Sequence, residues 1–96
     1  MTIRVLIKRK VVPGNELTVA DLLTRLRAIA LQARGYISGE TLHALEDVNE
    51  SLVISTWETL EDWRAWEANA GRRDLQAKID RLLVYPSEHR VMLYGA

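Results

Sequence analysis

The most informative stretch of the chain is Leu52-Val53-Ile54-Ser55-Thr56-Trp57, an apolar and β-branched run that follows a polar turn. Side chains alternate between the two faces of a strand, so Leu52 and Ile54 are expected on one face and Val53 and Trp57 on the other. An antiparallel sheet with one face open to water would carry polar residues on that face. Both faces of this strand are therefore expected to be covered.

Three further segments predict strands around this run. Residues 36–45 alternate in polarity and are joined to it by a polar turn, which indicates a hairpin. Residues 3–12 stop at Pro13-Gly14 and predict a first strand, and residues 90–94 predict a last one. The run 52–57 thus becomes the third of four strands.

The segments between these strands have the apolar spacing of helices. Apolar residues recur at three- and four-residue spacing over 17–35, which predicts one helix. A second helical region begins at Thr59, where Asp62 completes a capping-box spacing, and Gly71 is expected to bend or interrupt it. The order βαββαβ predicts a ferredoxin-like α+β fold, in which a four-stranded antiparallel sheet carries both helices on one face.

The second face of that sheet needs a partner, because two helices cover only one face. Leu6 on the first strand and Met92 on the last repeat the apolar pattern of the third, and 48% of the 96 residues are hydrophobic. A chain of this length holds one core, so residues 1–96 are expected to form a single domain. We expect a homodimer in which two such sheets pack face to face.

Composition excludes several classes of protein. The formal charge is zero, from 13 Lys+Arg and 13 Asp+Glu. The chain therefore has no net positive charge to attract the phosphate backbone of a nucleic acid. Without cysteine there is no disulfide framework or thiolate site, and the two histidines lack metal-ligand spacing. No apolar run reaches the roughly 20 residues that span a bilayer, and the chain begins without a signal-peptide layout. We therefore expect a cytoplasmic protein with no metal and no membrane partner.

Four segments are similar to the antibiotic biosynthesis monooxygenase (ABM) family, and together they extend over nearly the whole chain. They are GYISGETL at 35–42, LVISTWE at 52–58, EDWRAW at 61–66 and KIDRLL at 78–83. The resemblance implies a ferredoxin-like protomer, a dimeric α/β barrel, and a ligand pocket between the sheet and the helices of each protomer. It is more specific for fold than for chemistry.

Two catalytic branches of that family place different residues in the pocket. In the cofactor-free branch, which oxygenates phenolic substrates with O2, the resemblance assigns Trp57 to the pocket. Val53 stands where that branch has Asn, and Trp63 stands where it has Tyr. In the haem-degrading branch Trp66 matches a pocket Trp, but Gln76 stands where that branch has the iron-binding His. Iron would lack its axial nitrogen, so haem is disfavoured and no cofactor is expected.

Few residues of the predicted pocket offer acid–base chemistry. Oxygenation without a cofactor needs a base that forms the substrate anion in an apolar site. His43 is the candidate base, because imidazole titrates near neutral pH. In a regular strand Tyr36 and Glu40 share the face opposite His43, so either His43 or that pair reaches the pocket. Ser55 is a further candidate to bind substrate by a hydrogen bond.

Other residues have both a functional and a structural interpretation. Trp57, Trp63 and Trp66 form a wall that stacks on an aromatic ligand, or they are the large core residues of a small domain. Arginines on the helices, among them Arg27, are interpreted as solvated, and Arg72-Arg73 either share that role or guard the mouth of the pocket.

The leading functional hypothesis is a small dimeric protein that binds a hydrophobic aromatic molecule and oxygenates it without a cofactor. The alternatives are a non-catalytic ligand-binding or stress-related module that uses the same pocket, and a variant haem-binding or haem-degrading site. The residues leave open whether the protein is an enzyme.

Overall fold

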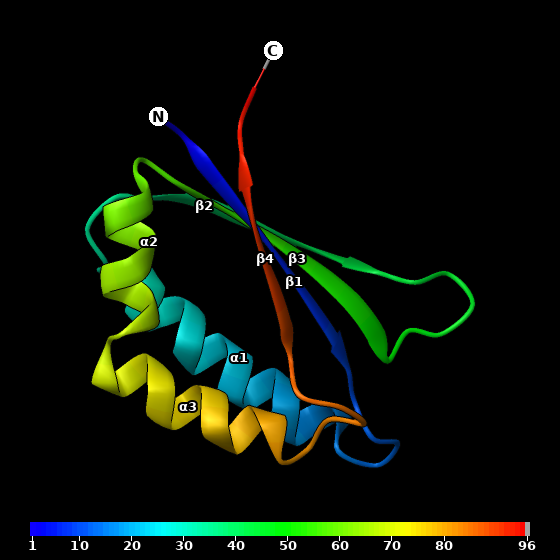
Figure 1. Cartoon of the computed structure of the whole chain (residues 1–96). Coiled ribbons are helices and arrows are strands. Elements are labelled where there is room, and N and C mark those ends of the chain that lie inside the picture. Colours follow the sequence, from blue (N-terminus) through cyan, green and yellow to red (C-terminus); the bar gives the residue numbers. More distant parts are fainter. Residues whose placement is uncertain (96) are drawn as a thin grey trace.

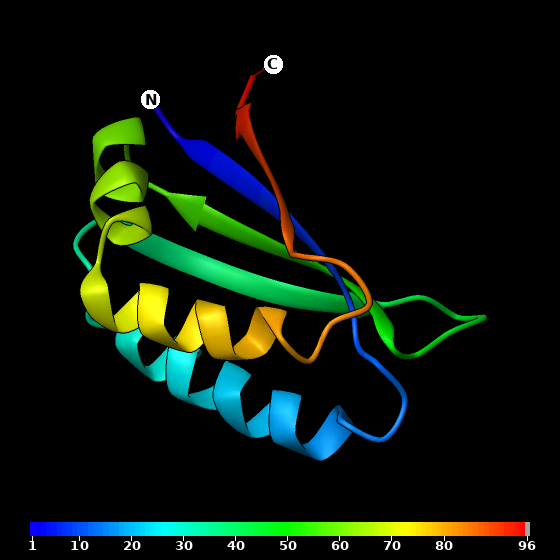
Figure 2. The same ribbon diagram turned by 60° about the horizontal axis from the view of Figure 1, so that its bottom comes forward.

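The computed structural model describes residues 1–95, which form four strands and three helices in the order β1-α1-β2-β3-α2-α3-β4. The elements are β1 (Ile3–Lys10), α1 (Glu16–Ala30), β2 (Tyr36–His43), β3 (Glu50–Trp57), α2 (Leu60–Glu67), α3 (Ala70–Asp80) and β4 (Glu88–Leu93). The strands form one antiparallel sheet in the order β2-β3-β1-β4, and the helices lie on one side of it (Figures 1 and 2). The predicted ferredoxin-like α+β fold is confirmed. None of the described helices is long and apolar enough to cross a membrane.

The central pair of strands forms the inner face of the sheet against the helices. In the register of β1 with β3, Ile3 lies opposite Trp57, Val5 opposite Ser55, and Ile7 opposite Val53. Val5 is completely buried and Trp57 is 1% exposed, so this alternating set is the floor of the core. The faces predicted for β3 are confirmed.

The second helical region is divided into α2 and α3, but the division lies before Gly71. Thr59 Oγ1 accepts a hydrogen bond from the backbone N–H of Asp62 at 3.1 Å, which confirms the predicted cap of α2. The side chain of Asn69 accepts one from the N–H of Arg72 at 2.9 Å and begins α3. Gly71 therefore lies inside the first turn of α3, and the prediction that it interrupts the helix is wrong.

An irregularity in β2 changes which of its residues face the helices. The register with β3 shifts between Tyr36 and Ser38. Tyr36 pairs with Trp57 on the inner face, whereas Glu40 pairs with Ile54 on the outer face. The expectation that Tyr36 and Glu40 share a face was based on a regular strand, and it is wrong because one extra residue in β2 reverses the alternation.

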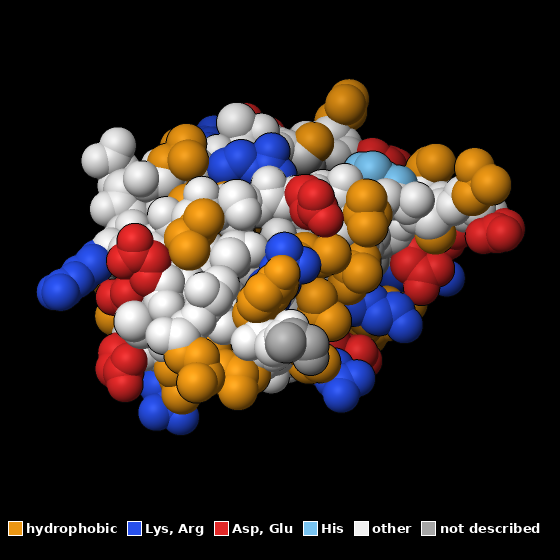
Figure 3. Space-filling model, turned by 90° about the horizontal axis from the view of Figure 1, so that it is seen from above, with side chains coloured by type: hydrophobic (Ala, Val, Ile, Leu, Met, Phe, Trp, Pro, Cys, Tyr) orange, Lys and Arg blue, Asp and Glu red, His pale blue; other side chains and the backbone are white. Residues whose placement is uncertain are grey.

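The outer face of the sheet carries apolar side chains near its centre, and Lys8, Glu40 and Arg90 lie beside them. Leu6, Leu52 and Ile54 are half-buried, while Leu42 and Met92 are 52% and 40% exposed. Figure 3 looks down on the side of the molecule away from α1 and α3, where hydrophobic side chains gather between charged ones. No described helix covers this face.

Gly35, which precedes β2, has a conformation that only glycine adopts easily. Its φ is +80°, and a Cβ built on it would overlap the side chain of Asp62. Gly14 also has a positive φ, of +100°, but a Cβ there would meet no atom within 4 Å. Gly35→Ala is expected to lower the free energy of unfolding by about 2–3 kcal/mol, and Gly14→Ala by about 1 kcal/mol, in urea denaturation. Equal losses would show that the contact with Asp62 is not rigid.

Candidate active site

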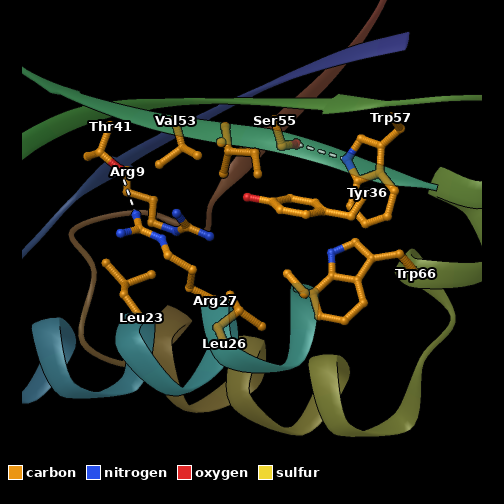
Figure 4. Close-up of a pocket in the computed structure, with 13 residues that line it drawn as sticks. Arg9, Leu23, Leu26, Arg27, Tyr36, Thr41, Val53, Ser55, Trp57 and Trp66 are labelled. Atoms are coloured by element: carbon orange, nitrogen blue, oxygen red, sulfur yellow. Dashed lines mark hydrogen bonds between the residues drawn. The ribbon is translucent and has the colours of Figure 1, made fainter. Parts of the chain in front are cut away.

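A cavity of about 80 Å³ lies between the inner face of the sheet and helices α1 and α2 (Figure 4). Five of the residues singled out in the sequence line it. They are Val53, Ser55 and Trp57 from β3, Tyr36 from β2 and Trp66 from α2. The fold thus brings most of the predicted substrate-binding residues into one place.

Three aromatic rings form one end of the cavity. The ring centroids of Trp57 and Trp66 are 5.9 Å apart with planes inclined by 27°, while Tyr36 meets Trp57 edge-on at 5.2 Å. Trp57 Nε1 donates a hydrogen bond of 3.1 Å to Ser55 Oγ. This bond holds the plane of the indole of Trp57 against Ser55.

Trp63 does not line the cavity, although it contacts residues that do. Its ring centroid lies 5.8 Å from that of Trp57, and its side chain is 1% exposed. Its other neighbours are the guanidinium of Arg72, 5.6 Å from the ring centroid, and His89. Trp63 therefore supports Trp57 from within the core.

The structure places His43 outside the cavity, at the end of β2. Its side chain is exposed, and its Nδ1 lies 2.9 Å from the carbonyl oxygen of Val48 in the β2–β3 turn. A carbonyl oxygen only accepts hydrogen bonds, so Nδ1 carries the proton. Glu40 faces away on the outer side of the sheet. Neither group can act on a ligand bound at Trp57.

Gln76 is buried on α3 and reaches the cavity only through another side chain. Its carbonyl oxygen accepts a hydrogen bond of 3.3 Å from Arg9, while its amide nitrogen donates to Asp80 at 2.9 Å and to Ser87 Oγ at 3.0 Å. Arg9 itself lines the cavity. Gln76 thus positions Arg9 and does not face a ligand directly.

The residues around the cavity do not fit a haem. Gln76, at the position that the resemblance gives to an iron ligand, has its amide engaged by Arg9, Asp80 and Ser87. Neither histidine lines the cavity. Residues 1–95 also contain no group of three His, Asp or Glu side chains that could hold a metal ion.

Sequence reasoning missed two arginines in the cavity wall. Arg9 continues the inward alternation of Ile3, Val5 and Ile7 and is 2% exposed. Arg27, which was expected to be solvated, does have an exposed side chain, but it lines the cavity and donates a 3.2 Å hydrogen bond to Thr41 Oγ1. Arg9 follows Ile3, Val5 and Ile7 at two-residue spacing, so the alternation along β1 places it on the inner face although its side chain is charged.

Burial dominates the electrostatics of Arg9. Desolvation lowers its pKa to about 10, Asp80 opposes this shift, and Arg72 adds to it. Within residues 1–95 no carboxylate oxygen lies within 4.0 Å of the guanidinium, and its buried Nε has no hydrogen-bond partner. Arg9 is therefore a buried cation without a paired anion.

Arg72 is neither solvated nor at the mouth of the cavity, so both sequence interpretations are wrong for it. The side chain is 7% exposed, because it packs on Trp63 in the core. It donates to the Glu67 carbonyl at 3.2 Å, and its Nη2 lies 3.1 Å from His89 Nε2. A guanidinium has no acceptor, so His89 Nε2 accepts and the ring is neutral.

His89 is expected to make folding sensitive to mildly acidic pH. Burial first, then Arg72 and Arg9, lower its pKa below the ordinary 6.5. Between the two values the unfolded chain binds a proton that the native chain does not, so the free energy of unfolding falls as pH drops below about 6.5. Denaturation midpoints measured from pH 7 to 5 should show this fall in the wild type and in the control His43→Gln. If the free energy of unfolding still falls over this pH range in His89→Gln, a group other than His89 causes the pH dependence.

Comparisons with known proteins agree with this architecture. Residues 2–78 match the family model described as antibiotic biosynthesis monooxygenase, whereas a search of curated proteins finds no match. A conserved protein from Methanosarcina mazei Go1 superposes with a TM-score of 0.92 at 17% identity, covering 99% of this chain and 94% of the other. SnoaB, a cofactor-independent oxygenase from Streptomyces nogalater, gives 0.87 at 17% identity, with coverage of 99% and 94%.

A protein from Mycobacterium tuberculosis is similar in the same way, with a TM-score of 0.89 at 12% identity and coverage of 100% and 97%. At such identities the superpositions show a common fold, and functions do not transfer with it. The family match is independent of them and covers most of the sequence, including β1, β2, β3 and nearly all of α3. The chain therefore belongs to the antibiotic biosynthesis monooxygenase family.

Proposed function

We propose that the cavity binds a phenolic aromatic molecule and that the protein oxygenates it with O2 without a cofactor. The observation that carries the proposal is the aromatic end of the cavity, where Trp57, Trp66 and Tyr36 surround one space. Offset and edge-on aromatic contacts favour a flat ring in that space. Family membership supports the reaction class, and the fold shared with a cofactor-independent oxygenase is consistent with it.

The reaction needs no external reductant when the substrate supplies both electrons. A phenol whose para carbon bears hydrogen reacts with O2 to give a para-quinone and water. One oxygen atom forms the new C–O bond, and the other leaves as water with the two hydrogens that the substrate loses. The substrate must first lose its phenolic proton, because the anion gives an electron to O2 more readily.

The cavity residues contribute to this chemistry by binding and by excluding water. Trp57 and Trp66 are 1% and 7% exposed, so a ring packed against them leaves bulk solvent. The described lining contains no carboxylate or imidazole. Arg9 and Arg27 carry positive charges that stabilise the phenolate form of the substrate, so its proton can pass to water without a protein base.

A second candidate function is ligand binding without turnover, in the same cavity. It is favoured by Val53, an apolar side chain where the catalytic branch of the family has an amide, and by the lack of a base in the described lining. Calorimetric titration with single-ring phenols that carry hydrogen at the para carbon and with anthrones, with O2 uptake recorded in parallel, separates the two. Binding with O2 uptake supports the oxygenase, and binding without it supports the module.

We also propose that the working form is a homodimer joined through the outer face of the sheet. Leu6, Leu52 and Ile54 on this face are only half-buried in one chain, and they lie beside the exposed Leu42 and Met92. A second sheet packed on this face would cover them. Light scattering should give twice the 11.0 kDa of the chain at micromolar concentration. A mass of one chain would overturn the dimer.

A further inference from the structure

Two guanidinium groups meet at one end of the cavity, away from the tryptophans. Arg9 comes from β1 and Arg27 from α1, and both line the same space as Trp57 and Trp66. In Figure 4 they lie at the end opposite the two indoles, and the hydroxyl of Tyr36 points from the aromatic end toward them. The cavity therefore has an apolar, aromatic end and a cationic end.

Neither guanidinium forms a direct ion pair with a described residue, and Asp80, which favours the charged form of Arg9, reaches it only through Gln76. Within residues 1–95 no Asp or Glu oxygen lies within 4.0 Å of either guanidinium. The hydrogen-bond partners of Arg9 and Arg27 are the uncharged side chains of Gln76 and Thr41. Arg9 Nε is buried without a partner, and burial lowers the pKa of this arginine. An anion that enters would form the direct charge-assisted hydrogen bonds that the described carboxylates do not provide.

The geometry of the donors and the size of the space restrict the ligand. A guanidinium presents a planar fork of N–H groups that fits a carboxylate, so a carboxylate is the group expected at this end. At about 80 Å³ the cavity is smaller than the roughly 150 Å³ of an engineered cavity that holds benzene. Arg27 is exposed and can move outward to widen the mouth, whereas Arg9 is held by Gln76. Even one ring therefore needs Arg27 to move outward, and three fused rings need far more space than that movement adds, so a single ring is the ligand expected here.

We propose that the ligand is a single-ring aromatic carboxylate, whose ring lies against Trp57 and Trp66 and whose carboxylate lies between Arg9 and Arg27. The inference rests on the proposed binding of an aromatic molecule and adds the charge and size of that molecule. A phenol that carries a carboxylate elsewhere on its ring satisfies both proposals, since its para carbon remains free to react.

Isothermal titration calorimetry at pH 7 with 3-hydroxybenzoate and the neutral 3-hydroxybenzamide tests the charge. The wild type is expected to bind the acid at least about tenfold more tightly than the amide, because only the acid forms charge-assisted hydrogen bonds. Arg9→Met and Arg27→Met should lose this preference while they still bind the amide. Arg25→Met is the matched control, because Arg25 lies on the same helix and pairs with Asp21 at 3.0 Å.

Each outcome separates this inference from the proposed function. Equal affinity for the acid and the amide in the wild type would overturn the carboxylate proposal and leave the aromatic site standing. Failure of both compounds to bind would overturn the aromatic site as well. A preference that survives in Arg27→Met, whose exposed side chain can be replaced without disturbing the core, would also overturn the inference. Tighter binding of anthracene-2-carboxylate than of 3-hydroxybenzoate would overturn the single-ring limit.

Discussion

Trp57→Ala is expected to lower the free energy of unfolding by about 3–5 kcal/mol, the usual range for removing a buried tryptophan. Trp57 is 1% exposed and contacts Tyr36, Trp63 and Trp66. The change removes the ring that joins the sheet to α2 and leaves Ser55 without its hydrogen bond. A loss of this size is a large part of the total stability of a small domain.

Urea denaturation followed by circular dichroism measures this loss without relying on tryptophan emission. Leu17→Ala is the control, because Leu17 is 87% exposed on α1 and its replacement should change stability by less than about 0.5 kcal/mol. Trp57→Phe keeps an aromatic ring and should remain folded, so it is the variant for binding studies. If Trp57→Phe bound these phenols and anthrones as the wild type does, the aromatic wall would not be the binding surface.

The fold could be predicted from the sequence because local patterns determine most of it. The alternation of Leu52, Val53 and Ile54 assigned both faces of β3, and Thr59 with Asp62 marked the start of α2. The break between α2 and α3 was anticipated, but it was assigned to Gly71. Asn69 makes the break because its side chain caps α3, and a capping amide is as local a signal as a glycine.

The site was predicted less completely because it depends on pairings between distant residues. The register shift between Tyr36 and Ser38 exists only when β2 pairs with β3, so its position could not be predicted from β2 alone. Arg9 is buried beside Gln76, 67 positions away in the chain, and a charged residue in a strand is expected at the surface until such a partner is known. His43 had the right chemistry for a base, but its position at the strand end keeps it out of the cavity.

Gln76→Leu is expected to lower the free energy of unfolding by about 2–3 kcal/mol, because it leaves the buried Arg9 cation without its hydrogen-bond partner. The replacement has a similar volume, so the effect is polar and not a cavity. Gln32→Leu is the control, since Gln32 is exposed after α1 and its change should be close to neutral. Thermal and urea unfolding of the single variants measure both effects.

The double variant Arg9→Met with Gln76→Leu distinguishes an unpaired charge from lost packing. If the cost of Gln76→Leu is that of an unpaired cation, removing the cation as well should restore at least about 1 kcal/mol, whereas independent costs would add. Arg9→Met alone removes the cost of burying the cation, so its free energy of unfolding should equal or exceed that of the wild type. An Arg9→Met protein that is equally stable and has lost its preference for 3-hydroxybenzoate would show that this buried charge serves binding at the expense of folding.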